Sequence, residues 1–138
     1  MRSKYRRILF AIIWYVLARW NPRGSLFHWR SFLLRIFGAK IKGVVYVYPS
    51  VEIWDPKNLT MNHGATLDES VFIYNVAEIS IGARAIISRN STLCTATHNY
   101  NTNTFDLVSK PIVIENDAWI CMDVFVAPGI IVKPFGVA

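Results

Sequence analysis

Cysteine is nearly absent from this sequence, which argues against a fold held by disulfides. The chain of 138 residues contains only Cys94 and Cys121. They form neither a CxxC motif nor a Cys/His spacing of the kind that binds zinc, so we predict no metal site. We expect both to be reduced thiols in a cytosolic protein, with a disulfide between them as the less favoured alternative.

Acidic residues are missing from the first 42 residues. That segment holds ten Lys or Arg, whereas residues 43–138 hold five Lys or Arg and nine Asp or Glu. The basic residues are mixed with Ile, Leu, Phe and Trp and do not line a polar face, which argues against binding to nucleic acid. A basic segment with a large apolar surface is typical of contact with an anionic membrane surface. A solvated helix face is the alternative.

A long hydrophobic run is also missing. The uninterrupted apolar run from Ile8 to Ala18 is eleven residues long, whereas a helix that spans a bilayer needs roughly 20 residues. No A-x-A cleavage pattern follows this run, which disfavours a signal peptide. We therefore predict a helix over residues 4–20 that lies at a membrane interface, docks on the rest of the protein as a cap, or does both.

A second helix is predicted after a break at residues 21–24 (NPRG). Ser25 is a suitable N-cap, Gly38 is a suitable stop, and the helix is expected from Leu26 to Phe37. Its apolar stripe comprises Phe32, Leu33, Ile36 and Phe37, and Arg30 and Arg35 are expected to lie off this stripe. Residues 1–40 thus form a basic helical leader, whose residues 1–37 are the candidates for peripheral membrane contact.

The remainder of the chain repeats every six residues. Neither the 3.6-residue period of a helix nor the 2.0-residue period of a strand explains this spacing. A repeat of six fits a short strand followed by a turn, with the same inward position used on each flat face of a parallel β-helix. The predicted inward residues are Met61, Leu67, Ile73, Ile81, Ile87, Leu93, Ile114, Ile120, Val126 and Val132. A second small or apolar set follows most of them by four residues: Ala65, Val71, Ala85, Ser91, Ala118, Val124 and Ile130.

Three such hexads make one triangular coil. We place coils at about 41–60, 61–80, 81–98 and 111–128, followed by a partial coil, with the loop 99–110 interrupting the repeat. Two-residue insertions at 55–60 and 75–80 fall at equivalent places, so we expect them to stack at one corner. The domain 41–138 ends inside a hexad, and an open coil end exposes unpaired backbone groups. We therefore expect the natural chain to be longer at its C-terminus.

Several motifs resemble the hexapeptide-repeat acyltransferases. The segments IGARAIISRNSTLCTATH and PIVIENDAWICMDVFVAPGIIV resemble this family in order and spacing. The segments FHWRSFLLRIFGAKI, YPSVEIWDPKNLTM and IYNVAEISIG are similar to the WcaF-like colanic acid biosynthesis acetyltransferase group. The resemblance covers nearly the whole chain and implies an all-β fold, a left-handed parallel β-helix with an N-terminal α-helical cap. The left hand comes from the resemblance alone, since crossover connections between parallel strands are otherwise right-handed.

The resemblance also implies an activity. It predicts a homotrimeric O-acetyltransferase that moves an acetyl group from acetyl-CoA to a hydroxyl of a sugar or lipid-linked glycan precursor. The expected location is the cytoplasm, with peripheral contact at the inner face of the membrane as the further expectation. His98, which closes LCTATH, matches the family's general base. An imidazole suits this task because its pKa lies near neutral. A direct transfer requires no covalent intermediate, so the lack of a G-x-S-x-G elbow is no objection.

Other residues are implicated by the same resemblance. Asn75, Asn99 and Tyr100 are the predicted acceptor-binding residues, and Trp119 and Met122 the predicted acetyl-CoA contacts. A turn-forming role for Asn75 and ordinary packing for Trp119 are equally plausible from the residues themselves. One departure is that Asn99 stands where the group commonly has Asp after the histidine, and an amide would orient the imidazole less well than a carboxylate.

Each of these predictions has an alternative in which the residue or segment has only a structural role. His28 and His63 are expected to be structural, and His98 itself has a structural hydrogen bond as its alternative role. The loop 99–110 is either a tolerated surface loop or, as in the family, a segment that shapes the acceptor pocket beside a neighbouring subunit. For the whole chain, the second interpretation is a non-catalytic trimeric scaffold or a decayed acyltransferase.

Overall fold

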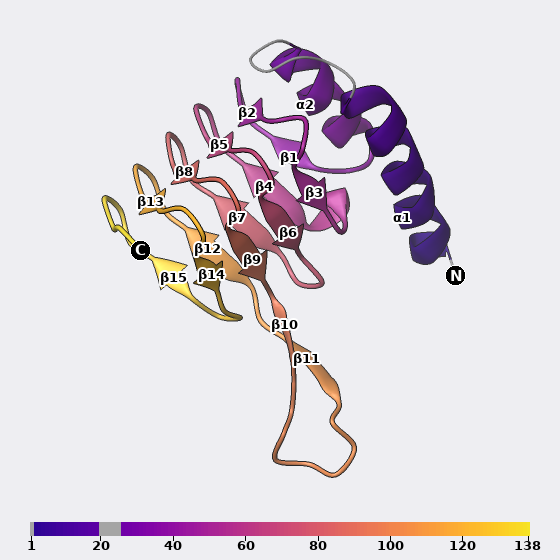
Figure 1. Ribbon diagram of the computed structural model, residues 1–138, viewed down its shortest axis with the longest axis vertical. Coiled ribbons are helices and arrows are strands. Elements are labelled where there is room, and N and C mark those ends of the chain that lie inside the picture. The colour runs from indigo at the N-terminus through magenta and orange to yellow at the C-terminus, as the bar shows by residue number, and fades with distance from the viewer. Residues whose placement is uncertain (1, 20–25) are drawn as a thin grey trace.

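The computed structural model, which describes residues 2–19 and 26–138, is a coil of short parallel strands that begins beneath two helices (Figure 1). The helical part comprises α1 (Arg2–Ile13), a π-helical turn (Trp14–Ala18) and α2 (Phe27–Ile36). The first two coils contain β1 (Lys40–Ile41), β2 (Tyr46–Val47), β3 (Glu52–Ile53), the 3₁₀ turn Pro56–Asn58, β4 (Leu59–Met61), β5 (Thr66–Leu67) and β6 (Phe72–Tyr74). The rest contains β7 (Ile79–Ile81), β8 (Ile86–Ile87), β9 (Thr92–Cys94), β10 (Ala96–His98), β11 (Leu107–Ser109), β12 (Ile112–Ile114), β13 (Trp119–Ile120), β14 (Phe125–Val126) and β15 (Ile131–Val132).

Three parallel sheets form the faces of the coil. Their strand orders are β1-β4-β7-β12-β15, β2-β5-β8-β13 and β3-β6-β9-β14. Each strand therefore pairs with the equivalent strand of the next coil, as in the register Tyr46↔Thr66↔Ile86↔Trp119. The predicted left-handed parallel β-helix is confirmed.

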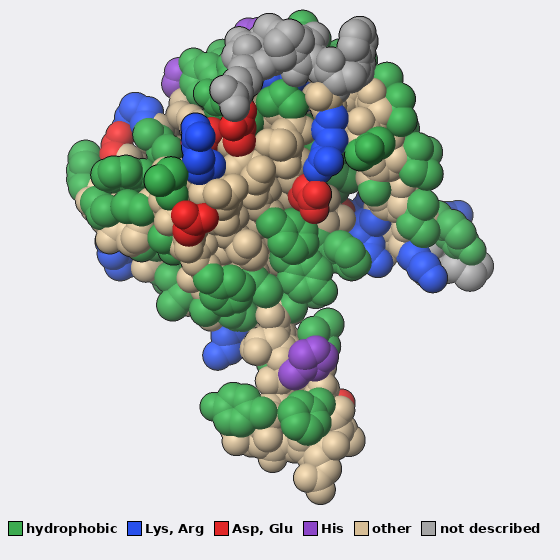
Figure 2. Space-filling view, in the orientation of Figure 1, with side chains coloured by type: hydrophobic (Ala, Val, Ile, Leu, Met, Phe, Trp, Pro, Cys, Tyr) green, Lys and Arg blue, Asp and Glu red, His purple; other side chains and the backbone are tan. Residues whose placement is uncertain are grey.

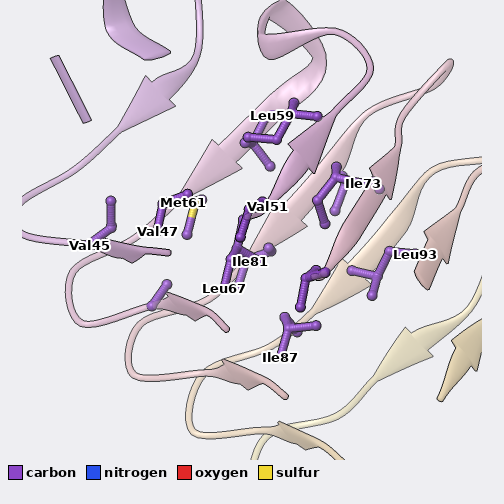
Figure 3. Close-up of a cluster of buried hydrophobic side chains, with 14 of the residues drawn as sticks. Val45, Val47, Val51, Leu59, Met61, Leu67, Ile73, Ile81, Ile87 and Leu93 are labelled. Carbon is purple, nitrogen blue, oxygen red and sulfur yellow. The ribbon is translucent and has the colours of Figure 1, made fainter. Parts of the chain in front are cut away.

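Aliphatic side chains stack along the axis of this coil (Figure 3). Leu67, Ile87 and Ile120 occupy equivalent rungs of one sheet, and all three are fully buried. The predicted inward residues are buried from Met61 through Val126, which confirms the period of six. Val132 is only partly buried and Ile130 is 44% exposed, and both belong to the last rung that the structure describes.

The coil turns through residues in the left-handed backbone conformation. Ser70, Arg84, Asn90, Asp117 and Asp123 all have φ near +60°. This conformation is strained for most side chains and easiest for Gly, Asn and Asp, which explains why polar residues recur three positions after the inward aliphatic one. The two-residue insertions stack at one corner as predicted: the Asn75 side chain bonds the backbone of Asp55 one coil away.

The two helices lie over the open end of the first coil (Figure 1). Phe10 and Trp14 are buried, and the Trp14 indole N–H donates to the carbonyl of Val51 at 2.8 Å. The Arg6 guanidinium pairs with the Asp55 carboxylate at 2.8 Å. The predicted helical cap is therefore present, with α1 beginning at Arg2 and the π-helical turn ending at Ala18.

The second helix departs from the prediction in the face that it buries, since Phe32 and Ile36 of the predicted apolar stripe are 51% and 60% exposed. Gly38 follows it with φ +101°, the positive φ expected of a helix stop. The predicted cap residue Ser25 and the break at 21–24 lie outside the described residues. Arg30, which lies off the predicted apolar stripe, is fully buried, and its Nε donates to the carbonyl of Val47. Arg30 covers the end of the coil, where a guanidinium can satisfy an open carbonyl while its stem packs as an apolar chain. Burial lowers the pKa of Arg30.

Candidate functional site

The site predicted around His98 sits on a hairpin that leaves the stacked corner of the coil. Strand β10 pairs antiparallel with β11 in the register Ala96↔Ser109, Thr97↔Val108 and His98↔Leu107. The Lys110 backbone N–H donates to the Thr95 carbonyl at 2.9 Å and closes the base of the hairpin. The segment 99–110 is thus an ordered excursion with a strand of its own, and it projects away from the prism (Figure 1).

The imidazole of His98 is oriented by a backbone carbonyl. Its Nδ1 lies 2.7 Å from the carbonyl oxygen of Phe105. A carbonyl only accepts hydrogen bonds, so the neutral imidazole carries its proton on Nδ1 and keeps the lone pair on Nε2. His98 is exposed, and Nε2 is therefore the atom available to take a proton from a substrate.

Phe105 is the contributor that the sequence did not reveal. It has φ +48°, an uncommon conformation for an aromatic residue, and its carbonyl oxygen lies 2.7 Å from Nδ1 of the imidazole. A backbone carbonyl leaves no trace in residue identity, so no motif could have indicated it. The aspartate that Asn99 replaces is not needed to fix the tautomer here, because Phe105 already does so.

The residues next to His98 shape the tip of the hairpin. The Asn99 side-chain oxygen accepts from the Asn101 backbone N–H at 3.1 Å, and the Asn99 backbone N–H donates to the Asp106 carbonyl at 2.9 Å. Tyr100 is 80% exposed. Asn99 and Tyr100 therefore lie beside His98, with the Tyr100 ring open to solvent in this single chain.

Asn75 is placed differently from the other predicted acceptor residues. It is fully buried, and its amide both accepts from the Asp55 backbone N–H at 2.9 Å and donates to the Asp55 carbonyl at 2.7 Å. The side chain is thus engaged in holding successive coils together at the stacked corner. This geometry favours the turn-forming alternative for Asn75.

Trp119 and Met122 lie on and just after β13, in a different sheet from the strand that leads to the hairpin (Figure 1). Trp119 is 48% exposed, and its indole N–H donates to the Ser88 hydroxyl at 2.9 Å. Met122 is 58% exposed. The single chain does not bring this pair together with His98, so a site that contains all three needs a second copy.

The other histidines and the cysteines have simpler surroundings. The Nδ1 of His63 accepts from the Val44 backbone N–H at 3.1 Å, a structural role at a corner. Cys94 and Cys121 are both free thiols, as expected. Within residues 2–19 and 26–138, neither helix has the length and apolar character needed to cross a bilayer.

Comparison with known proteins supports the family read from the motifs. The chain is 45% identical over 111 residues to the colanic acid biosynthesis acetyltransferase WcaF of Escherichia coli K12, and equally to that of Shigella flexneri; the match covers 80% of this chain. The resemblance to the WcaF acetyltransferases is confirmed. The match covers 60% of the length of these relatives. No protein-family model matches the sequence.

Solved structures agree on the fold. A hexapeptide-repeat acetyltransferase of Vibrio cholerae, VCA0836, complexed with acetyl-CoA, superposes with a TM-score of 0.83 at 20% identity, over 97% of this chain and 73% of that one. A galactoside acetyltransferase in complex with coenzyme A gives a TM-score of 0.76 at 19% identity, over 94% of this chain and 65% of that one.

Proposed function

We propose that this protein is an O-acetyltransferase that moves an acetyl group from acetyl-CoA to a hydroxyl of a sugar or exopolysaccharide precursor. The observation that carries the proposal is the His98–Phe105 hydrogen bond, which leaves Nε2 of an exposed imidazole free as a base. The similarity to the WcaF relatives supports acetyl transfer, and their name supports a polysaccharide acceptor. The acetyl-CoA and coenzyme A complexes of the structural neighbours support the donor.

The proposed acetyl transfer starts at Nε2 of His98, the ring nitrogen that keeps its lone pair. Nε2 of His98 takes the proton of the acceptor hydroxyl as its oxygen attacks the thioester carbonyl of acetyl-CoA. The tetrahedral intermediate then collapses and breaks the carbon–sulfur bond, and the imidazolium returns the proton to the departing thiolate. The products are the acetyl ester and free CoA, and the Phe105 carbonyl holds the imidazolium in place throughout. We assign Asn99 and Tyr100 to the acceptor and Trp119 and Met122 to the donor.

We further propose that the working form is a homotrimer. Leu107 and Val108 of β11 are 54% and 39% exposed, and Phe105 is 59% exposed, so the hairpin carries apolar side chains that its own coil does not cover. A neighbouring copy that covers them would also bring a second prism face toward His98. This arrangement would unite residues that one chain keeps apart.

We also propose peripheral contact with the cytoplasmic face of the membrane through α1. Its outward side exposes Tyr5, Leu9 and Ile12, and the π-helical turn that follows exposes Val16, each more than half exposed. The basic residues Arg2, Lys4, Arg6 and Arg7 lie in the first two turns of α1. An exposed apolar face beside cations is typical of a helix that lies at an anionic interface.

A transfer assay tests the activity. The purified full chain is incubated with acetyl-CoA labelled in the acetyl group and with a panel of mono- and oligosaccharides. We expect label to enter the carbohydrate as an alkali-labile ester, because the acceptor atom is oxygen. Label that resists alkali would indicate an amide and contradict O-acetylation. Absence of transfer from a chain shown to bind acetyl-CoA would favour the non-catalytic scaffold.

A further inference from the structure

A groove of about 580 Å³ runs between α1 and the outer surface of the coil. We call it the α1 groove. The helix side contributes Ile8, Phe10 and Trp14, and the coil side contributes Ile53, Trp54 and Phe72. The side chains that face each other across it are therefore apolar or aromatic, and none of them belongs to the His98 site.

The polar residues of the α1 groove are mostly basic. Lys4, Arg7 and Arg19 line it, and Glu52 is the only acidic residue among its lining. Glu52 already pairs with Arg19 at 2.9 Å, so Lys4 and Arg7 have no acidic counterpart within the groove. The Arg7 guanidinium lies 4.5 Å above the Trp54 ring, and its Nε is buried without a hydrogen-bond partner. The groove thus combines an apolar lining with an excess of positive charge.

The α1 groove is continuous with the exposed face of the helix. Ile8 and Tyr15 line the groove and are also 47% and 67% exposed. Figure 2 shows hydrophobic side chains along the outer surface of α1, with Lys and Arg side chains gathered near its lower end. The first turn of α1 contains no acidic residue, and cations at this end are opposed by the helix dipole, which favours an anion there.

We infer that the α1 groove binds one hydrocarbon chain of an anionic membrane phospholipid. The chain lies between α1 and the β3–β6 surface, and the phosphate pairs with Lys4 and Arg7. A bilayer lipid fits better than a second copy of the protein, because two basic side chains of the lining, Lys4 and Arg7, have no acidic partner there and complement a phosphate. It also fits better than a soluble anion, because the groove opens beside the apolar face of α1. The inference rests on the proposed membrane contact and is independent of acetyl transfer.

The test uses the full chain and vesicles of 70% phosphatidylcholine and 30% phosphatidylglycerol, with bromine atoms at the middle of the acyl chains. Bromine quenches tryptophan fluorescence only at short range, and Trp54 lies in the groove, away from the outward face of α1. We expect quenching by these vesicles, and we expect Trp54→Phe to remove at least half of it. Vesicles of phosphatidylcholine alone should give at least fivefold less quenching.

A matched pair of variants separates the groove from the helix face. Ala11 lines the groove and Ser3, on the same helix, does not, and both are exposed. Ala11→Phe should fill the groove and reduce quenching at least twofold, whereas Ser3→Phe should not reduce it. Circular dichroism checks that both variants fold. If Ala11→Phe does not fold, the loss of quenching in Trp54→Phe still tests the inference.

Three results would overturn the inference. Equal quenching of the wild type and Ala11→Phe, with equal sedimentation on vesicles, would show adsorption of the helix without a chain in the groove. Absence of sedimentation for the wild type would reject both the membrane contact and the groove ligand, while the acetyl-transfer assay in solution would be unaffected. Loss of the oligomer in Ala11→Phe would show that the groove is a contact between copies.

Discussion

At the residue scale, the orientation of His98 depends on a neighbour whose identity matters little. The Phe105 carbonyl fixes the tautomer through a 2.7 Å contact with Nδ1. The group's Asp after the histidine led us to expect poorer orientation from Asn99, yet the Asn99 side chain bonds the hairpin backbone instead. The base was predictable from the motif LCTATH, whereas its orienting partner was not, because a carbonyl belongs to every residue type.

Asn75 provides a residue-scale prediction about stability. Asn75→Ala removes the partners of a buried N–H and a buried carbonyl of Asp55. Each buried polar group left unpaired costs about 1–3 kcal/mol, so we expect a lower free energy of unfolding in urea and an unchanged KM for the acceptor. Asn101→Ala, on the exposed hairpin tip, is the control and should change stability little. An Asn75→Ala protein of wild-type stability with a raised KM would instead show that Asn75 contacts substrate.

At the element scale, the period of six predicted the rungs because every inward position meets the equivalent position of the next coil. Side chains at Leu67, Ile87 and Ile120 stack directly, so substitution of Ile87 affects both of its neighbours.

Two features were not predicted from the sequence, the burial of Arg30 and the strand β11, and each has its own reason. Arg30 caps carbonyls at an open coil end, a tertiary requirement that an apolar stripe does not encode. Strand β11 forms because its partner β10 lies beside it, although the surrounding Asn and Thr residues indicate a loop.

Adjacent isoleucines of β8 test the stacking. Ile87 is fully buried and Ile86 is 44% exposed. Ile87→Ala leaves a cavity between two rungs and should cost about 2–5 kcal/mol. Ile86→Ala is the matched control and should cost less than about 1 kcal/mol in the same urea titration. Similar losses for both variants would contradict the inward direction of Ile87.

The corner pair Arg84–Asp117 gives a pH-dependent prediction. The Arg84 guanidinium donates two hydrogen bonds to the Asp117 carboxylate, at 2.6 and 2.8 Å, and these lower the pKa of Asp117 from its ordinary value. A carboxyl with a lowered folded pKa stabilises the fold above its unfolded pKa, about 3.9, and this contribution disappears as the pH falls through the lower folded value.

Thermal unfolding of Asp117→Asn measures this effect. Asn tolerates the φ of +60° at this corner, so the substitution removes the charge without straining the turn. We expect a lower midpoint than wild type at pH 7 and convergence of the two midpoints below about pH 4. Asp123→Asn, at the φ +59° position of another corner, controls for loss of an acidic charge. A difference that persists undiminished at low pH would rule out the ion pair as its source.

At the scale of the whole molecule, the hairpin and α1 present two separate apolar surfaces, for which we propose different roles. The hairpin, which leaves the coil between β9 and β12, exposes apolar side chains beside His98, and α1 exposes another apolar set over the capped end (Figure 1). Two substitutions of equal chemistry distinguish these surfaces. Leu107 and Leu9 are 54% and 53% exposed, so a new carboxylate at either position should be tolerated by the fold.

Light scattering measures the mass of each variant in solution, and sedimentation with vesicles measures its membrane binding. Leu107→Asp should reduce the mass in solution from trimer to monomer, lower acetyl transfer at least tenfold and leave vesicle binding per chain intact. Leu9→Asp should preserve the trimer and weaken binding to anionic vesicles at least tenfold. A trimer that survives Leu107→Asp would contradict the role proposed for the hairpin.

The rate of acetyl transfer after substitution of single histidines tests the central claim most directly. At saturating acetyl-CoA, loss of a general base costs about 10²–10⁴-fold in rate, so His98→Ala should fall by that factor while His63→Ala, which lacks only a corner hydrogen bond, should keep kcat within about threefold. A His98→Ala protein that is folded, trimeric and as fast as wild type would contradict the assignment of Nε2 as the base.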